Sequence, residues 1–336
     1  MHPAGNTMLK QPLVSVVIPV YNGQRYIRKT IETALAQTYP SIEIIVVDDG
    51  STDDTADIVG AISRSDDRIH AFRKSNGGVA AARNHGISQA RGELIAMLDA
   101  DDLWHPEKIS RQVAELAASP QDVGVVYCWA IDIDENDNVI PPPEQVGSKR
   151  AHRGYVTAQL AEECFIETSS APLLRKSYVE RMGGYDVHLK PQGAEDWKLY
   201  LGLSEICAFA VVPEYLVGYR QYGASLSRGV NGMAGSIDLV SRWVTNKWPD
   251  LPTEIGRNRT YHTSCYLASK ALSNNQFREA IYYRVRAHRV RSRFLDFSTI
   301  GFSARLLLRT IGLKPATFRR GRSSISFNEF ISLKTG

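Results

Sequence analysis

Residues 94–102 read LIAMLDADD, a short apolar run that ends in three carboxylates within four positions. A run of this length and composition is typical of a buried strand in a parallel sheet, because helices cover such strands on both faces. Three carboxylates so close together repel one another strongly unless a cation is present. The stretch therefore predicts a buried strand with a polar, cation-attracting site at its carboxyl end.

The pattern repeats toward the amino terminus, where apolar runs alternate with helical periodicity four times in about 110 residues. This alternation predicts a parallel, doubly wound sheet, in which ligands bind beyond the carboxyl ends of the strands. Pro19 is expected to close the first strand, because proline cannot donate to the ladder. The expected strands are 14–18, 42–47, 69–72 and 94–98.

The pattern is less regular beyond residue 120. The apolar runs predict strands at 123–129 and 172–174, a surface loop at 132–143, and an edge strand at 209–212 closed by Pro213. From about residue 230 the periodicity is helical, and a break at 273–275 predicts an antiparallel helix pair. The expected organisation is a flexible tail (1–11), an α/β domain (12–228) and a mostly helical, basic extension (229–336).

Polar side chains follow each of the first four predicted strands. Pro19 to Asn22 follow the first, Asp48 and Asp49 the second, a loop leading to Arg83 the third, and Asp99–Asp102 the fourth. Mg²⁺ and Mn²⁺ take oxygen ligands and often use one or two carboxylates together with substrate phosphates. Solvation or helix capping would explain an isolated acidic triplet. Acids after two of the apolar strands, 42–47 and 94–98, favour a metal and phosphate site instead.

Six motifs occur in order, and together they resemble the family 2 glycosyltransferases. They are PVYN (19–22), IIVVDDGSTDDT (44–55), NGGVAAARNHG (76–86), LDADDLW (98–104), GGYD (183–186) and AEDW (194–197). The resemblance runs from about Leu13 to Ser227. It implies a Rossmann-like GT-A domain with a mostly parallel, mixed sheet, and an inverting, metal-dependent enzyme that uses a nucleotide sugar.

The resemblance also implies roles for matching residues. The donor nucleotide, favoured as a uridine diphosphate, would contact a set of residues that includes the ribose-binding Asp99. Asp101 would hold Mn²⁺ or Mg²⁺, and Asp196, with Glu195 beside it, would act as the base. A carboxylate within hydrogen-bond reach of an acceptor hydroxyl suits that task, and a helix-capping role for Asp196 is compatible with it. The donor-binding set is Pro19, Tyr21, Asp48, Asp49, Arg83, Asp99, Ala100 and Arg220.

Two later segments match the family less closely. Thr168, Ser169 and Trp197 are expected to line the sugar and acceptor cleft, although a polar strand edge explains 167–170 equally well. At 219–225 the family shows YRxHxxS, whereas this chain has Tyr222 in place of the histidine. Arg220 stays a candidate for the diphosphate, and a second metal contact from this loop is in doubt. No QxxRW motif is present, which disfavours a processive synthase.

Other classes of function are weighed against this one. No GxGxxG follows the first strand, which argues against a dinucleotide dehydrogenase. A nucleotidyltransferase usually has a Gly-rich basic loop there, which PVYNG does not supply. A non-catalytic nucleotide-sugar-binding or scaffold protein would be favoured if Asp101 or Asp196 were missing, and both are present. The acceptor is expected to be a glycan or a lipid-linked sugar.

Charge is concentrated near the carboxyl terminus. The formal net charge of +4 does not imply a nucleic-acid partner, but 278–322 holds twelve Lys/Arg and two acids. Apolar residues between Phe297 and Ile311 recur at helical spacing, so this segment either docks on an anionic membrane or packs on the catalytic domain. No apolar stretch is long enough to span a bilayer, and no signal peptide is recognised. The protein is expected to be cytoplasmic, and both peripheral binding to the cytoplasmic face of the membrane and a homo-oligomer are open alternatives.

Overall fold

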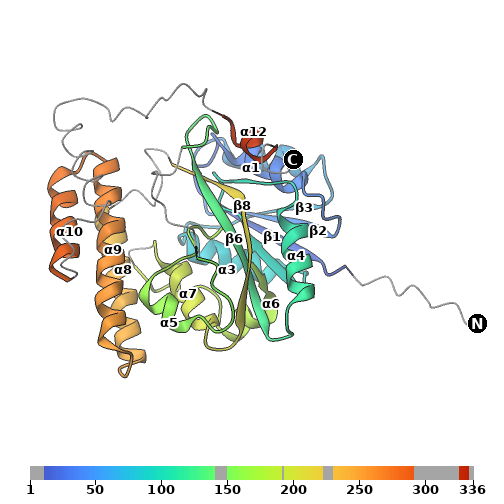
Figure 1. The fold of residues 1–336 in the computed structure, drawn as a ribbon. Helices are drawn as coiled ribbons and strands as arrows, with labels where there is room; N and C mark the ends of the chain where they lie inside the picture. The colour runs from blue at the N-terminus through green and yellow to red at the C-terminus, as the bar shows by residue number, and fades with distance from the viewer. Residues whose placement is uncertain (1–10, 141–149, 191–192, 222–229, 291–324, 333–336) are drawn as a thin grey trace, which may run out of the picture.

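A computed structural model describes residues 11–140, 150–190, 193–221, 230–290 and 325–332. They form a mixed α/β fold on one eight-stranded sheet, with the strand order β3-β2-β1-β4-β7-β6-β8-β5. Figure 1 shows helices packed around this sheet and a group of long helices, α8 to α10, standing beside it. The expected fold class, an α/β domain followed by helices, is confirmed.

The strands are β1 (Val14–Val20), β2 (Ile42–Asp48), β3 (Ile69–Arg73), β4 (Leu94–Met97), β5 (Leu103–Trp104), β6 (Val123–Ile133), β7 (Leu173–Arg175) and β8 (Ala208–Arg220). The helices are α1 (Ile27–Leu35), α2 (Thr55–Ser63), α3 (Val79–Gln89), α4 (Lys108–Ala118), α5 (Thr157–Glu162), α6 (Lys176–Arg181), α7 (Glu195–Leu203), α8 (Val230–Lys247), α9 (Thr253–Ser273), α10 (Phe277–Val290) and α12 (Phe327–Ser332).

Strand directions bring the functional loops to one edge. β1 pairs in parallel with β2 and β4, and β2 in parallel with β3. β7 is antiparallel to both β4 and β6, and this double reversal makes β6, and β8 beside it, parallel to β4. Every residue of β1 and β2 is buried, as expected for central strands covered on both faces.

Two prolines lie inside strands, which corrects the prediction that each closes its strand. β1 continues through Pro19 to Val20, and Pro19 pairs only with β2, because the pairing of β1 with β4 ends at Val17. β8 continues through Pro213, where the register with β6 jumps across a bulge. Both prolines occupy positions that need no ladder N–H, which is where sheets tolerate them. β6 likewise runs into the predicted 132–143 loop.

Three long helices, α8 to α10, follow β8 in the chain. α9 and α10 pack together as the expected helix pair, and the turn between them places Asn275 at a φ of 59°. Figure 1 shows α10 as the outermost helix of this group. No described helix is both long and apolar enough to cross a membrane. The segment from Phe297 to Ile311, predicted to be amphipathic, lies outside the described residues.

Candidate active site

Arg83 is delivered to the site by a close contact between α3 and β1. At Gly86, one turn further along α3, a Cβ atom would lie 2.3 Å from a methyl carbon of Val17. Only glycine therefore permits this approach of the helix to the strand. The contact holds the start of α3, and with it Arg83, at the carboxyl end of the sheet.

Arg83 joins two acidic elements that are far apart in the sequence. Its Nη1 donates to Glu195 Oε1 at 2.7 Å, and its Nη2 donates to Asp99 Oδ1 at 2.8 Å and to Ser169 Oγ at 2.7 Å. Ser169 Oγ in turn donates to Asp99 Oδ2 at 2.7 Å. The Tyr185 ring lies 5.1 Å from the guanidinium carbon. The start of α7 and the end of β4 are thus connected through one buried cation.

Asp102, the last acid of the LDADD stretch, points into the protein. Its Oδ2 accepts hydrogen bonds from Ser170 Oγ (2.6 Å) and Thr168 Oγ1 (3.1 Å), and its Oδ1 accepts from the Arg220 amide (3.0 Å). The side chain is fully buried. Burial and the charges of the two preceding aspartates raise the pKa of Asp102 well above its usual value. Asp102 therefore anchors the loop.

The Arg220 side chain is buried as well, and it holds the acidic loop from the other side. Nε donates to the Asp101 carbonyl at 2.7 Å, Nη1 to the Asp134 carbonyl at 2.8 Å, and Nη2 to Asp137 Oδ1 at 2.5 Å. The Tyr26 ring lies 4.4 Å from the guanidinium carbon. These contacts correct the expectation that Arg220 faces a donor diphosphate, because its donors are directed to protein acceptors.

Asp196 lies in the first turn of α7. Its Oδ1 accepts a hydrogen bond from the Trp197 amide at 2.7 Å. Burial, followed by the charge of Glu195, raises the pKa of Asp196 from 3.8 to about 7. Glu195 itself is 4% exposed and is bound by Arg83, so it points inward. Of the two acids, Asp196 is therefore the one that can exchange a proton near neutral pH.

The cleft residues predicted from the sequence are placed differently. Thr168 and Ser169 are buried and support Asp102 and Asp99. Trp197 is 3% exposed, and its indole donates to the Leu160 carbonyl, so its ring lies in the core. That position corrects the expectation of a cleft-lining Trp197. A motif gives the order of residues along the chain, and it does not show which side of a helix faces the cleft.

Asp49 and Asp48 organise the loops after β2. The Asp49 carboxylate accepts hydrogen bonds from the amides of Gly77 (3.0 Å) and Gly78 (2.8 Å), and Lys74 Nζ lies 2.6 Å from Oδ1. Asp48 Oδ1 accepts from the Ser51 amide at 2.8 Å. This arrangement fixes the loop that leads into α3.

The loop after β1 presents an exposed aromatic side chain. Tyr21 is 53% exposed, whereas Pro19 is buried in the strand. Ala100 lies at the end of β4 and accepts a hydrogen bond from the Thr30 hydroxyl through its carbonyl. Asn22 was not singled out from the sequence, yet its Oδ1 accepts from the Thr52 amide at 2.8 Å and so joins the loops after β1 and β2.

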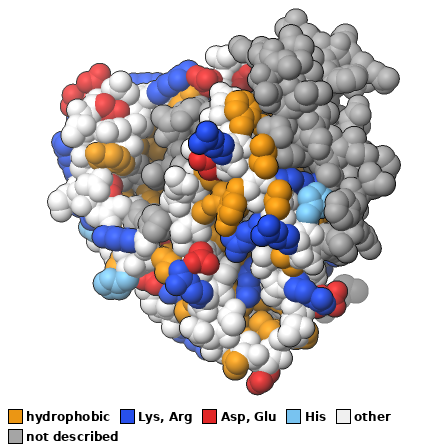
Figure 2. All heavy atoms as spheres, turned by 90° about the vertical axis from the view of Figure 1, so that its left-hand side faces the viewer, with side chains coloured by type: hydrophobic (Ala, Val, Ile, Leu, Met, Phe, Trp, Pro, Cys, Tyr) orange, Lys and Arg blue, Asp and Glu red, His pale blue; other side chains and the backbone are white. Residues whose placement is uncertain are grey.

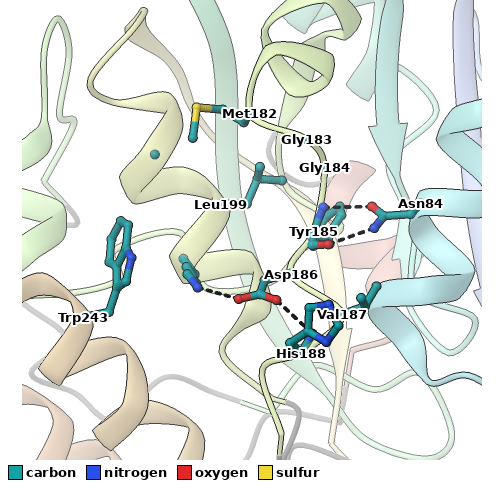
Figure 3. A pocket seen from close by; sticks show the side chains of 12 residues that line it. Asn84, Met182, Gly183, Gly184, Tyr185, Asp186, Val187, His188, Leu199 and Trp243 are labelled. Carbon is teal, nitrogen blue, oxygen red and sulfur yellow. Dashed lines mark hydrogen bonds and ion pairs between the residues drawn. The ribbon is translucent and has the colours of Figure 1, made fainter. Parts of the chain in front are cut away.

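Tyr185 is a further residue without a predicted role, although it lies in the GGYD motif. Figure 3 shows the Asn84 amide bonded to the Tyr185 backbone on one side of this loop. Lys198 is paired with Asp186 in the same loop. Both anchors hold the Tyr185 ring against Arg83. The same loop borders a groove of about 440 Å³ that also contacts Trp243 on α8.

A divalent metal would have to be held by few protein ligands. Within the described ranges, no three or more His, Cys, Asp or Glu side chains are grouped to hold a metal ion. Asp99 is paired with Arg83 and Asp102 is fully buried, whereas Asp101 is only partly buried at the strand end. One carboxylate completed by substrate phosphates and water is a donor set that suits Mg²⁺ or Mn²⁺. The residues present fit such an ion.

Comparison with known proteins defines the class. The model of glycosyl transferase family 2 matches residues 15–183, so the chain belongs to this family. An uncharacterized glycosyltransferase of Rickettsia typhi is 46% identical over 140 residues, which make up 41% of this chain and 43% of the relative. The match thus spans less than half of that relative's length.

Solved structures support the fold over nearly the whole chain. S. aureus TarS 1–349 in complex with UDP-GlcNAc superposes with a TM-score of 0.55 at 15% identity and covers 90% of this chain and 92% of that one. The mannosyltransferase PcManGT of Pyrobaculum calidifontis, in complex with GDP-Man and Mn²⁺, gives 0.56 at 17% identity, with 90% and 87% covered. The fold is that of the GT-A glycosyltransferases.

Proposed function

We propose that this chain transfers a sugar from a nucleoside diphosphate donor, with a UDP-sugar favoured, to a hydroxyl of a glycan or lipid-linked acceptor, with inversion. One observation carries the proposal. Arg83 binds both Glu195 and Asp99, so the helix start that bears Asp196 and the loop that bears Asp101 form one connected unit. The solved complexes of TarS with UDP-GlcNAc and of PcManGT with GDP-Man support a donor of this kind.

Asp196 acts as the base in this proposal. Its carboxylate takes the proton of the acceptor hydroxyl while the hydroxyl oxygen attacks the anomeric carbon. The bond from that carbon to the diphosphate oxygen breaks, and the nucleoside diphosphate leaves from the opposite face. A base whose pKa is about 7 is deprotonated in much of the population at neutral pH and can still hold the proton it receives.

The donor side uses the edge formed by β1, β2 and β4. Tyr21 offers an exposed ring for the base, and Asp48 and Asp49 lie at the end of the neighbouring strand β2. Asp99 faces the ribose, and Arg83 holds its orientation. Mg²⁺ or Mn²⁺ held at Asp101 would supply Lewis-acid stabilisation of the leaving diphosphate. Glu195, Ser169 and Arg220 are positioning residues.

The test is a donor screen. Purified protein is incubated with UDP-, GDP- and dTDP-sugars in Mn²⁺, in Mg²⁺ and in EDTA, and release of nucleoside diphosphate is measured. We expect turnover of one donor class that depends on the metal and is lost in Asp101→Ala. Full activity of Asp101→Ala in excess EDTA would overturn the metal assignment.

The same screen separates the alternatives. A nucleotidyltransferase would release no nucleoside diphosphate; with added pyrophosphate it would convert the nucleotide sugar to a nucleoside triphosphate and a sugar 1-phosphate. A non-catalytic binding protein would bind a donor in calorimetry and show no turnover with any metal. Either result would replace the proposed transfer reaction.

A further inference from the structure

The outward face of α10 carries an unusual concentration of exposed apolar side chains. Seven large hydrophobic residues are exposed in the described part of the chain, and three of them fall within five consecutive positions of this helix. They are Ile281 (47% exposed), Tyr282 (61%) and Val285 (44%). Single exposed apolar residues are normal on proteins, whereas a cluster on one helix face points to a contact.

Arginines surround this cluster. Arg278, Arg286 and Arg289 are all exposed, and none forms an ion pair with another described residue. The opposite face of α10, which includes Ala280, Tyr283 and Ala287, is buried against α9. Figure 2 views the molecule from the α10 side and shows hydrophobic and Lys/Arg side chains next to one another on this surface. We call these six exposed residues the α10 face.

Charge decides which partner fits the α10 face. A second copy of the chain would bring arginines against arginines. The sequence that follows α10 is itself basic. Residues 291–324 hold seven Arg, one Lys and a single acid, Asp296, so this segment would repel the face in the same way. An apolar strip edged with unpaired cations instead complements a surface that is anionic outside and apolar beneath.

We propose that the α10 face docks on a bilayer surface that contains anionic phospholipid. Ile281, Tyr282 and Val285 would enter the boundary between headgroups and acyl chains, and the arginines would reach the phosphates. Tyrosine suits this depth because one end of its ring is apolar and the other polar. Docking through α10 would bring the enzyme to the surface that carries a lipid-linked acceptor, a consequence that rests on the proposed function.

The test compares matched variants of the full-length protein in vesicle cosedimentation. Vesicles of phosphatidylcholine, with and without phosphatidylglycerol, are used at low and high salt. Arg278→Gln, Arg286→Gln and Arg289→Gln are combined in one variant. Its control combines Arg28→Gln, Arg64→Gln and Arg181→Gln, which removes the same charge from exposed positions on α1, just after α2 and on α6. A second pair is Tyr282→Ser against Tyr155→Ser, at 61% and 62% exposure.

Wild type should bind the anionic vesicles at low salt, and the α10 arginine variant should lose on the order of 10²-fold in partition coefficient. Tyr282→Ser should lose several-fold, and both controls should bind like wild type. The inference is overturned if wild type stays soluble, if it binds neutral vesicles equally well, or if the α10 variants bind like their controls. Donor turnover in solution should be the same in all variants, so this result is independent of the proposed reaction.

Discussion

Arginines behave in opposite ways at the catalytic edge and on α10. Arg83 and Arg220 are 4% and 1% exposed and donate to carboxylates and carbonyls of the protein. Arg278, Arg286 and Arg289 are exposed. A buried guanidinium is retained because the acids around it would otherwise stand uncompensated, whereas an exposed one costs little and remains available to a partner. The contrast predicts that one kind of substitution has very different effects in the two regions.

The largest effect is expected from Arg83→Met. It leaves Glu195 buried and Asp99 half-buried without their cation, and breaking such a pair costs about 3–5 kcal/mol. Chemical denaturation should show a fall of that size in the free energy of unfolding, and turnover should be abolished. Arg83→Lys is the control, since it keeps the charge and loses the bidentate geometry of the guanidinium. Its free energy of unfolding should lie between those of wild type and Arg83→Met. An Arg83→Met protein as stable as wild type would break the comparison.

Asp196→Asn should give the next largest effect. It distinguishes a role of Asp196 as the catalytic base from a purely structural role. The change keeps the shape of the side chain and removes its basicity, so kcat should fall by roughly 10²-fold or more. Donor affinity in calorimetry should persist, because the donor is expected at the ends of β1, β2 and β4. Loss of donor binding with near-normal residual turnover would show that Asp196 has another role.

The pKa of Asp196 predicts opposite pH dependences for activity and stability. With the pKa raised to about 7, kcat/KM should fall about tenfold per pH unit below 7 and level off above it. Between about pH 4 and 7, the folded chain keeps a proton on Asp196 that the unfolded chain has already released. The stabilisation that this proton gives the folded state is therefore fully present below pH 4 and is lost as the pH rises through 7.

The stability side of this prediction is measured with the same variant. Asp196→Asn should be more stable than wild type at pH 8 by on the order of 2 kcal/mol, and the difference should shrink toward pH 4. The matched control is Asp57→Asn, an acid in the first turn of α2 outside the candidate site. An equal gain in both variants would attribute the effect to general charge.

Local patterns foresaw the fold because they depend on neighbouring residues. The runs at 14–18, 42–47 and 94–98 had to be buried strands, and their carboxyl ends had to meet. Pro19 and Pro213 escaped prediction, since whether a proline ends a strand depends on the neighbour it would have bonded. That is a property of tertiary pairing, which no local pattern contains.

The candidate site was foreseen as a set of residues more than as an arrangement. Asp99, Asp101 and Asp196 follow from the motifs, but the motifs do not say which acids face inward. Asp102 accepts hydrogen bonds from hydroxyls, and Glu195 is bound by Arg83. Arg220 donates to backbone carbonyls more than 80 positions away. Partners at that separation leave no periodic trace in the sequence. Tyr185 was overlooked for the same reason.

The smallest effect is expected from Arg286→Met, the same substitution as at Arg83 but on α10. Arg286 is exposed and forms no ion pair with another described residue, so its loss uncovers no buried charge. A surface change of this kind alters the free energy of unfolding by less than about 0.5 kcal/mol. Donor turnover should also be unchanged, because α10 packs on α9 through its opposite face and contributes no residue to the candidate site. Denaturation and turnover are measured beside Arg83→Met under identical conditions. A loss of stability comparable to that of Arg83→Met would mean that the Arg286 guanidinium is buried in solution. The contrast between buried arginines at the catalytic edge and exposed arginines on α10 would then be wrong.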